Sequence, residues 1–279
     1  MSAEESQETR NEGKQQVIQA DTSIWRGGLS GSICLAVVSF RRLFRSRQTI
    51  VSAMLLGFAV MVALAWSMRR GRTPEEFISQ ILIPVYTSFL LPIFCLCYAT
   101  ASIAAEREEQ TLTYLLLSPL PRPLVYVAKY CSSLALALLW TMGGLILLCQ
   151  VVGDPGQRTL AIVWPTVMAS TFAYVGLFHL FGVMFRRATI VGFAYALFLE
   201  NFVGSMPGIV KRVAVSFYTE CMIFDSAAIF GLGPAGHHDE AMYLPISAAA
   251  AMPALWLIAA ATLLAGIVFF SRHEYSGTS

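Results

Sequence analysis

The chain has 279 residues, of which 56% are hydrophobic and only 13% are charged. An ordinary soluble domain has a charged fraction of about a quarter, so this composition excludes that class. The mean hydropathy of +0.63 indicates a polytopic membrane protein. The net charge is +2, and the basic residues are scattered at the ends of apolar runs. Because they form no single basic patch, we expect no nucleic-acid partner.

The first 24 residues are polar and contain none of the apolar stretch that marks a signal peptide. They are predicted to form a disordered cytoplasmic tail, residues 1–24. Five of the six cysteines fall in apolar helical stretches, and Cys221 falls in a predicted external loop. Free buried thiols are therefore expected rather than a disulfide framework.

Residues 25–48 have the pattern of an amphipathic helix. Apolar side chains form one helical stripe, and the arginines lie off it. We predict a helix lying in the membrane surface with its arginines at the lipid phosphates. The alternative is a plain basic flank before the first span. The arginines concerned are Arg41, Arg42 and Arg45.

The first two spans follow directly, within a transmembrane domain predicted at residues 49–271. Span one is Ile50–Trp66, which has the length needed to cross a bilayer. Thr73 as N-cap and Pro74 at the first helical position begin span two. This span continues to about residue 105, and its prolines, Pro84 and Pro92, are potential kink sites.

Residues 106–123 stand between two long apolar runs and begin with charged residues from Glu106 to Glu109. These charges mark the point at which the chain leaves the bilayer. Thr111 is placed to cap a short helix, which Pro119 and two further prolines end. The leucines that share one face of this helix are Leu112, Leu115 and Leu116. Such a face needs a partner groove or the lipid headgroups to cover it.

This pattern resembles the cytoplasmic coupling segment in the permeases of type-two ABC transporters, the exporter class. Gln110 and Thr113 depart from it, because the family usually has Gly and Glu there. The resemblance implies that Glu106, Arg107, Glu108, Thr111, Leu112, Leu115, Leu116 and Pro119 contact a separate ATPase subunit. The matching residues are Glu106, Arg107, Glu108, Thr111, Leu112, Leu115, Leu116, Ser118, Pro119, Arg122 and Lys129.

Four further spans are expected after this segment. The third is 124–152, with Lys129 near enough to its inner end to extend to the surface. After the turn GDPGQR, the fourth span is 159–185. The fifth has only 12 apolar residues before Glu200. The sixth lies within 241–271, and residues 272–279 form a second cytoplasmic tail.

The region before the last span, residues 205–246, is too apolar for a free loop and too charged to cross the membrane. A short helix dipping into the external face fits it. The chain is therefore predicted to be an all-α polytopic membrane protein with six transmembrane helices, an N-terminal amphipathic elbow helix and a re-entrant segment. The resemblance implies the same arrangement.

The charge distribution predicts the orientation. With the N-terminus inside, 13 of the 19 Lys and Arg residues are cytoplasmic. The positive-inside rule then favours a bacterial cell-membrane protein with both termini on the cytoplasmic side, although Arg69, Arg70 and Arg72 oppose this orientation.

Two ionisable residues inside the spans are candidates for chemistry. Glu200 lies past the midplane, where a carboxylate is costly. It either lines a substrate path or marks the outer end of a short fifth helix. His179 is either a packed histidine or part of that path. We expect Glu200, Pro92 and His179 on the translocation pathway, and no metal site, because the adjacent His237 and His238 cannot easily converge on one ion.

No stretch matches the phosphate-binding pattern GxxxxGK[ST], so ATP and Mg²⁺ are expected on a partner ATPase and no cofactor on this chain. The resemblance implies a second permease chain, identical or different. Two alternatives stay open: a membrane-embedded enzyme that uses Glu200 and His179, and a non-transporting anchor of a larger complex.

Overall fold

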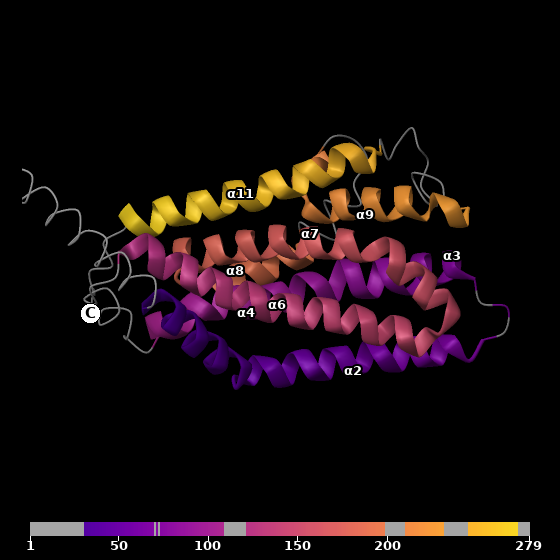
Figure 1. Ribbon diagram of the computed structural model, residues 1–279, viewed down its shortest axis with the longest axis horizontal. Helices are drawn as coiled ribbons and strands as arrows, with labels where there is room; N and C mark the ends of the chain where they lie inside the picture. Colours follow the sequence, from indigo (N-terminus) through magenta and orange to yellow (C-terminus); the bar gives the residue numbers. More distant parts are fainter. Residues whose placement is uncertain are drawn as a thin grey trace, which may run out of the picture.

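The computed structural model describes residues 31–69, 71, 73–108, 121–198, 210–231 and 245–272, without the side chains of 104–108 and 210. Every regular element in these ranges is a helix, and most helices run along one long axis (Figure 1). The all-α prediction is confirmed.

Among the described residues, five helical segments are long and apolar enough to cross a bilayer. A further apolar helix is described over Ala188–Phe198, begins with α8 (Ala188–Ala194) and lies in the predicted fifth span, whose continuation is outside the described residues. The five long segments are α2 (Arg47–Ser67), the second span from Pro74, α6 (Arg122–Val152), α7 (Asp154–Met184) and α11 (Ala248–Arg272).

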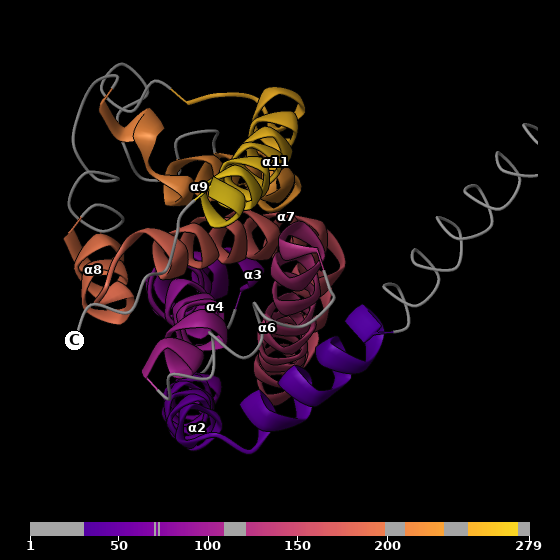
Figure 2. The same ribbon diagram turned by 90° about the vertical axis from the view of Figure 1, so that its left-hand side faces the viewer.

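α7 occupies the centre of the bundle. Viewed along the bundle, it lies between α11 on one side and α4 and α6 on the other, with α2 at the periphery (Figure 2). In the most apolar 18-residue stretch of α7, 67% of the residues are buried inside the protein. In the corresponding stretches of α2 and α11, only 22% are buried. α7 and the second span thus form the protein core, and α2 and α11 present apolar side chains outward.

The helix over residues 31–44 crosses the bundle obliquely, whereas α2 is seen nearly end-on in the same view (Figure 2). It ends at a break around Ser46, whose hydroxyl donates to the Leu43 carbonyl oxygen at 2.6 Å. The predicted continuous helix to residue 48 is therefore interrupted, and α2 begins at Arg47. Its position in the membrane surface stays a prediction.

The second span combines three helical segments, the α-helices α3 (Pro74–Phe77) and α4 (Leu91–Glu108) and the π-helix η1 (Ile78–Leu90) between them. The Thr73 hydroxyl accepts from the Glu76 amide at 3.3 Å, which confirms the predicted N-cap. η1 is a π-helix of 13 residues that contains Pro84. The Thr87 hydroxyl donates to the carbonyl of Leu82, five residues back, at 3.0 Å. π-Helical stretches are rare and often occur at functional sites.

The connection between α6 and α7 is tighter than predicted. Gly153 alone, at φ 84°, separates the two helices, and α7 begins at Asp154 rather than at residue 159. Asp154 and Pro155 favour helix initiation, because an acid suits the N-terminal dipole and proline suits the first turn. A side chain at Gly156 would collide with the backbone of Cys149, so the turn is closely packed.

Within the region between α8 and α11, the described residues 210–230 form η3 (Val210–Val213), α9 (Val215–Ser226) and η4 (Ala227–Phe230). α9 packs against α7 and α11, and the Asp225 carboxylate accepts from the Ala248 amide at 2.8 Å. Its proposed dip into the membrane stays a prediction.

The cysteine predictions were wrong in detail. Cys221 is buried in α9 rather than placed in a loop, because α9 packs its apolar face on the bundle. Cys34 and Cys131 are exposed, since each lies on the outward face of its helix.

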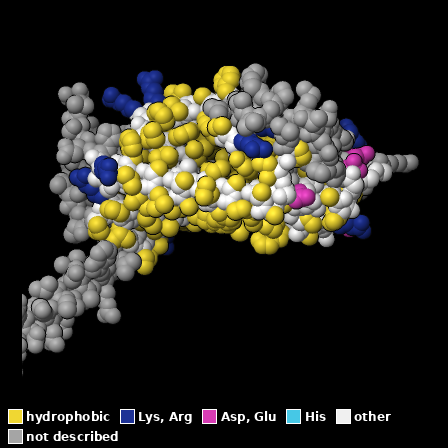
Figure 3. Space-filling model, turned by 90° about the horizontal axis from the view of Figure 1, so that it is seen from above, with side chains coloured by type: hydrophobic (Ala, Val, Ile, Leu, Met, Phe, Trp, Pro, Cys, Tyr) yellow, Lys and Arg dark blue, Asp and Glu magenta, His cyan; other side chains and the backbone are white. Residues whose placement is uncertain are grey.

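The described surface is a broad apolar band with charged side chains at its two ends and a few others partway along it (Figure 3). We call the end where α4 stops and α6 begins the basic end. The arginines that flank the helix ends here are Arg122, Arg186, Arg187 and Arg272, and Arg41, Arg42, Arg45 and Arg47 lie near the break between the helix over 31–44 and α2. The opposite end carries α3, the α6–α7 turn and α9.

Candidate functional site

The predicted coupling segment connects α4 to α6 at the basic end (Figure 1). The helix over Glu106, Arg107 and Glu108 is described, but their side chains are not. Glu200 and the remaining residues of the predicted coupling contact, Thr111, Leu112, Leu115, Leu116 and Pro119, lie outside the described residues. Their contacts stay predictions.

A buried polar cluster lies just inside the basic end, and the sequence analysis did not foresee it. Lys129 on α6 is 1% exposed, so the prediction that it extends to the surface was wrong. Its Nζ donates to the Ser102 carbonyl oxygen on α4 at 3.2 Å. An ammonium group is costly to bury unless polar groups surround it, and this carbonyl is one such group.

His179 on α7 completes the cluster and is fully buried. Its Nδ1 lies 3.1 Å from the Ser102 hydroxyl and 3.3 Å from the Ala99 carbonyl oxygen. The Ser102 hydroxyl donates to that same carbonyl at 2.9 Å, so its proton is already used. This arrangement favours the tautomer with the proton on Nδ1. Nε2 has no hydrogen-bond partner within the described ranges.

Two tyrosines of α6 enclose the imidazole. The ring centroids of Tyr126 and Tyr130 lie 4.7 and 5.7 Å from that of His179, both in edge-to-face geometry. The spacing follows from the helix, because Tyr126, Lys129 and Tyr130 are three and four residues apart and share one face. We call Ser102, Tyr126, Lys129, Tyr130 and His179 the Lys129 cluster.

The Lys129 cluster also reaches α11. The rings of Tyr126 and Phe270 are 5.7 Å apart, and Gly266 faces the Tyr126 ring with no room for a methyl group. α4, α6, α7 and α11 therefore meet around one set of side chains. His179 is in the packed, hydrogen-bonded position that was one of its two interpretations, and its place on a pathway stays a prediction.

A second set of polar contacts lies deeper in the bundle and was also missed. The Tyr86 hydroxyl donates to the Thr141 carbonyl, and the Thr171 hydroxyl lies 3.1 Å from that of Thr141. The hydroxyls of Ser170 and Thr219 are 2.7 Å apart and join α7 to α9. Hydroxyl-bearing residues within apolar spans were the signal that could have indicated these interhelical contacts.

The other predicted residues are placed as follows. Pro92 is buried in the first turn of α4. Arg41, Arg42 and Arg45 are exposed, and a hollow of about 350 Å³ is lined by Phe40, Arg41, Phe44 and Arg45. The rings of Phe40 and Phe44 stack with centroids 6.4 Å apart.

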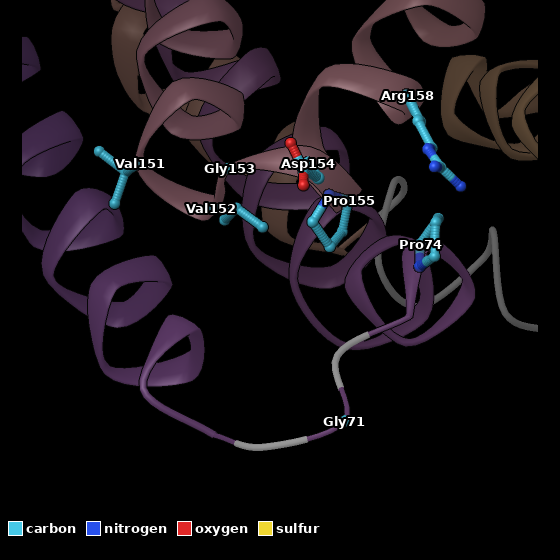
Figure 4. A pocket seen from close by; sticks show the side chains of 8 residues that line it. All are labelled: Gly71, Pro74, Val151, Val152, Gly153, Asp154, Pro155 and Arg158. Atoms are coloured by element: carbon cyan, nitrogen blue, oxygen red, sulfur yellow. The ribbon is translucent and has the colours of Figure 1, made fainter.

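A larger hollow of about 710 Å³ opens at the opposite end, beside the α6–α7 turn (Figure 4). Arg158 and Pro74 stand on one side of the view, and Val151 and Val152 on the other. Asp154 and Arg158 are its charged residues, and both are exposed. Among the residues that the structure describes, no group of three or more His, Cys, Asp and Glu side chains could hold a metal ion.

The sequence model of one family, described as ABC-2 family transporter protein, matches residues 44–210. This is more than half of the chain. The chain belongs to the ABC-2 transporter family. The matched region runs from α2 through α8 and includes residues 106–123 and the α4, α6 and α7 members of the Lys129 cluster. No curated protein was found to match the chain.

Membership in the ABC-2 family confirms the predicted resemblance and makes the chain a permease subunit of an ABC transporter. The apolar helices make this ABC-2 permease a multi-pass membrane protein. Its role is therefore that of a transport subunit.

Proposed function

We propose that this ABC-2 permease forms an export pathway with a second permease chain, identical or different, and is driven by a separate ATPase subunit that binds ATP and Mg²⁺. The observation that carries the proposal is the family match, which includes the charged segment 106–123 between α4 and α6. ATP binding would act on that segment, and the two spans that it joins would transmit the movement. Such a shift requires that ATP favour one of two states.

The proposed orientation places the basic end and both termini in the cytoplasm of a bacterial cell. The support is the concentration of arginines at the end where α4 stops and α6 begins. Arg41, Arg42 and Arg45 would then anchor the helix over 31–44 to lipid phosphates at the inner surface. Glu200, Pro92 and His179 remain the proposed pathway residues.

Affinity co-purification of the tagged chain from its native membrane tests the proposal. The test variant combines Glu106→Arg with Leu116→Asp, and the control makes the same exchanges at the opposite end, Glu76→Arg with Ile229→Asp. We expect an ABC-type ATPase to co-purify with wild type and control and to be lost from the test variant. If none accompanies wild type under mild extraction, the transporter proposal loses its main support. The membrane-embedded enzyme and the non-transporting anchor would then be the favoured functions.

A further inference from the structure

The Lys129 cluster lies close to both ends of the proposed coupling segment. Ser102 stands six residues before the end of α4 at Glu108, and Lys129 stands seven residues after the start of α6 at Arg122. At a rise of about 1.5 Å per residue, both contacts lie roughly 9–11 Å along the helices from these helix ends. This polar link between the two helices, formed by described side chains, is thus near the point where a push would enter.

α7 has no direct chain connection to segment 106–123, because α4 and α6 are the helices that the segment joins. A push reaches α7 along the chain only at the far end of α6, through the Gly153 turn, so at the basic end it can pass to α7 only through side-chain contacts. His179 supplies one at 3.1 Å from Ser102 on α4, and its ring is held by Tyr126 and Tyr130 of α6. Tyr126 extends the contact to α11 through Phe270.

Polar contacts are the ones most able to keep these helices together in lipid. Apolar side chains gain little hydrophobic free energy from leaving lipid tails for one another, so helix association in lipid depends on close packing and on interhelical hydrogen bonds. A buried ammonium or imidazole has no comparable partner in the lipid tails, and separating the helices would expose it. Figure 2 shows α4, α6, α7 and α11 grouped at the end facing the viewer.

We propose that Lys129 and His179 are positioning residues for the coupling step, which hold the basic ends of α4, α6 and α7 together as one rigid unit. Movement of segment 106–123 then carries α7 with it rather than bending α4 and α6 at their ends. This inference rests on the proposed coupling to an ATPase and identifies the residues that pass the movement on.

The test variants are Lys129→Met and His179→Leu, which remove the polar contacts but keep long apolar side chains. Lys129→Arg keeps a cation and serves as the conservative variant. The matched control is Lys211→Met in η3, outside the Lys129 cluster. Lys211 is also 1% exposed, with its Nζ 5.3 Å from the centre of the Phe217 ring.

The experiment uses the permease purified with its co-purifying ATPase, with native cysteines replaced, in lipid nanodiscs. Spin labels at Arg122 and Arg186, both exposed at the basic end, report the distance between the start of α6 and the end of α7. A third label at the exposed Gln157 reports mobility at the start of α7. Both readouts are taken without nucleotide and with a trapped non-hydrolysable ATP analogue.

In wild type we expect the distance between the Arg122 and Arg186 labels to stay the same on trapping, while the Gln157 label changes. In Lys129→Met and His179→Leu the distance should change and the response at Gln157 should be lost, although the ATPase still co-purifies. Lys129→Arg should retain part of the wild-type response, and Lys211→Met all of it. If the two residues only stabilised the fold, their variants would give less folded protein. The folded fraction would still keep the Arg122–Arg186 distance constant and respond at Gln157.

Three results would overturn the inference. The distance between the Arg122 and Arg186 labels in wild type could change when the ATP analogue is trapped. This result is obtained on wild type alone and does not depend on whether a variant folds. The variants could respond at Gln157 as wild type does. Lys129→Met could lose the ATPase altogether, which would assign Lys129 to assembly. Absence of any ATPase from wild type would instead reject the proposed function itself, and the inference with it.

Discussion

The contact between α11 and the Lys129 cluster makes a sharp prediction about two glycines. Gly266 on α11 faces the buried Tyr126 ring, and an added methyl group there would overlap the end of that ring. Gly143 on α6 has open space around its Cα. Gly266→Ala should destabilise the protein, and Gly143→Ala should not.

The expected magnitudes follow from helix propensity and packing. Replacing Gly by Ala inside a helix gains about 0.5–1 kcal/mol in either case. At Gly266 the methyl group must also displace Tyr126, which is held between the rings of His179 and Phe270. Overpacking of this kind costs about 1–3 kcal/mol. The two variants should therefore differ by about 1–3 kcal/mol in free energy of unfolding.

The difference is measured by thermal unfolding in nanodiscs, followed by intrinsic tryptophan fluorescence. By the usual scaling with size, the variants should differ in Tm by roughly 2–12 °C, with Gly266→Ala the lower. Equal Tm values would show that α11 does not approach Tyr126 this closely. The reasoning that α11 packs against the Lys129 cluster through Gly266 and Tyr126 would then be refuted.

Two further predictions concern the ends of the bundle. Arg41→Gln with Arg45→Gln should reduce the anionic phospholipid that native mass spectrometry finds on the purified chain, because guanidinium groups bind phosphate through charge-assisted hydrogen bonds. Arg158→Gln, at the opposite end, should not, and equal retention in all three proteins would contradict the anchoring role. Asp225→Ala should lower the free energy of unfolding by about 0.5–2 kcal/mol, the usual value of a lost helix cap. An unchanged unfolding midpoint would show that its bond to the first amide of α11 contributes nothing.

Structural features that depend only on neighbouring residues in the sequence were predicted well. Helix ends follow from charges and caps that lie next to them, as with Thr73, whose hydroxyl caps the second span as expected. The fifth span was predicted from its apolar run, and the structure has an apolar helix over the described part, Ala188–Phe198. Hydropathy reports how far a segment can extend through lipid, which is a property of that segment alone.

Features that depend on distant partners were not predictable in this way. Lys129 stands near a span end, where a lysine commonly extends to the surface. What holds it inside is the carbonyl of Ser102, 27 residues earlier in the chain. Gly153 likewise forms the whole α6–α7 turn, which brings Gly156 against the backbone of Cys149 with no room for a side chain. Nothing in a single segment reveals which neighbour will meet it.

The π-helix η1 is a third case. Its residues are apolar like those that begin α4 directly after it, and Pro84 indicated an irregularity without its type. The hydrogen bond from Thr87 to a carbonyl five residues back appears only once the helix is built.

The central claim, that segment 106–123 contacts a separate ATPase, is tested most directly by photo-crosslinking in living cells. A photoreactive phenylalanine analogue is placed at Leu116, and a control analogue at Ile229, which is 72% exposed in η4. On illumination, Leu116 should crosslink to a protein that mass spectrometry identifies as an ABC-type ATPase, and Ile229 should not. A Leu116 analogue that crosslinks only to lipid, or an ATPase adduct at Ile229 instead, would contradict the account.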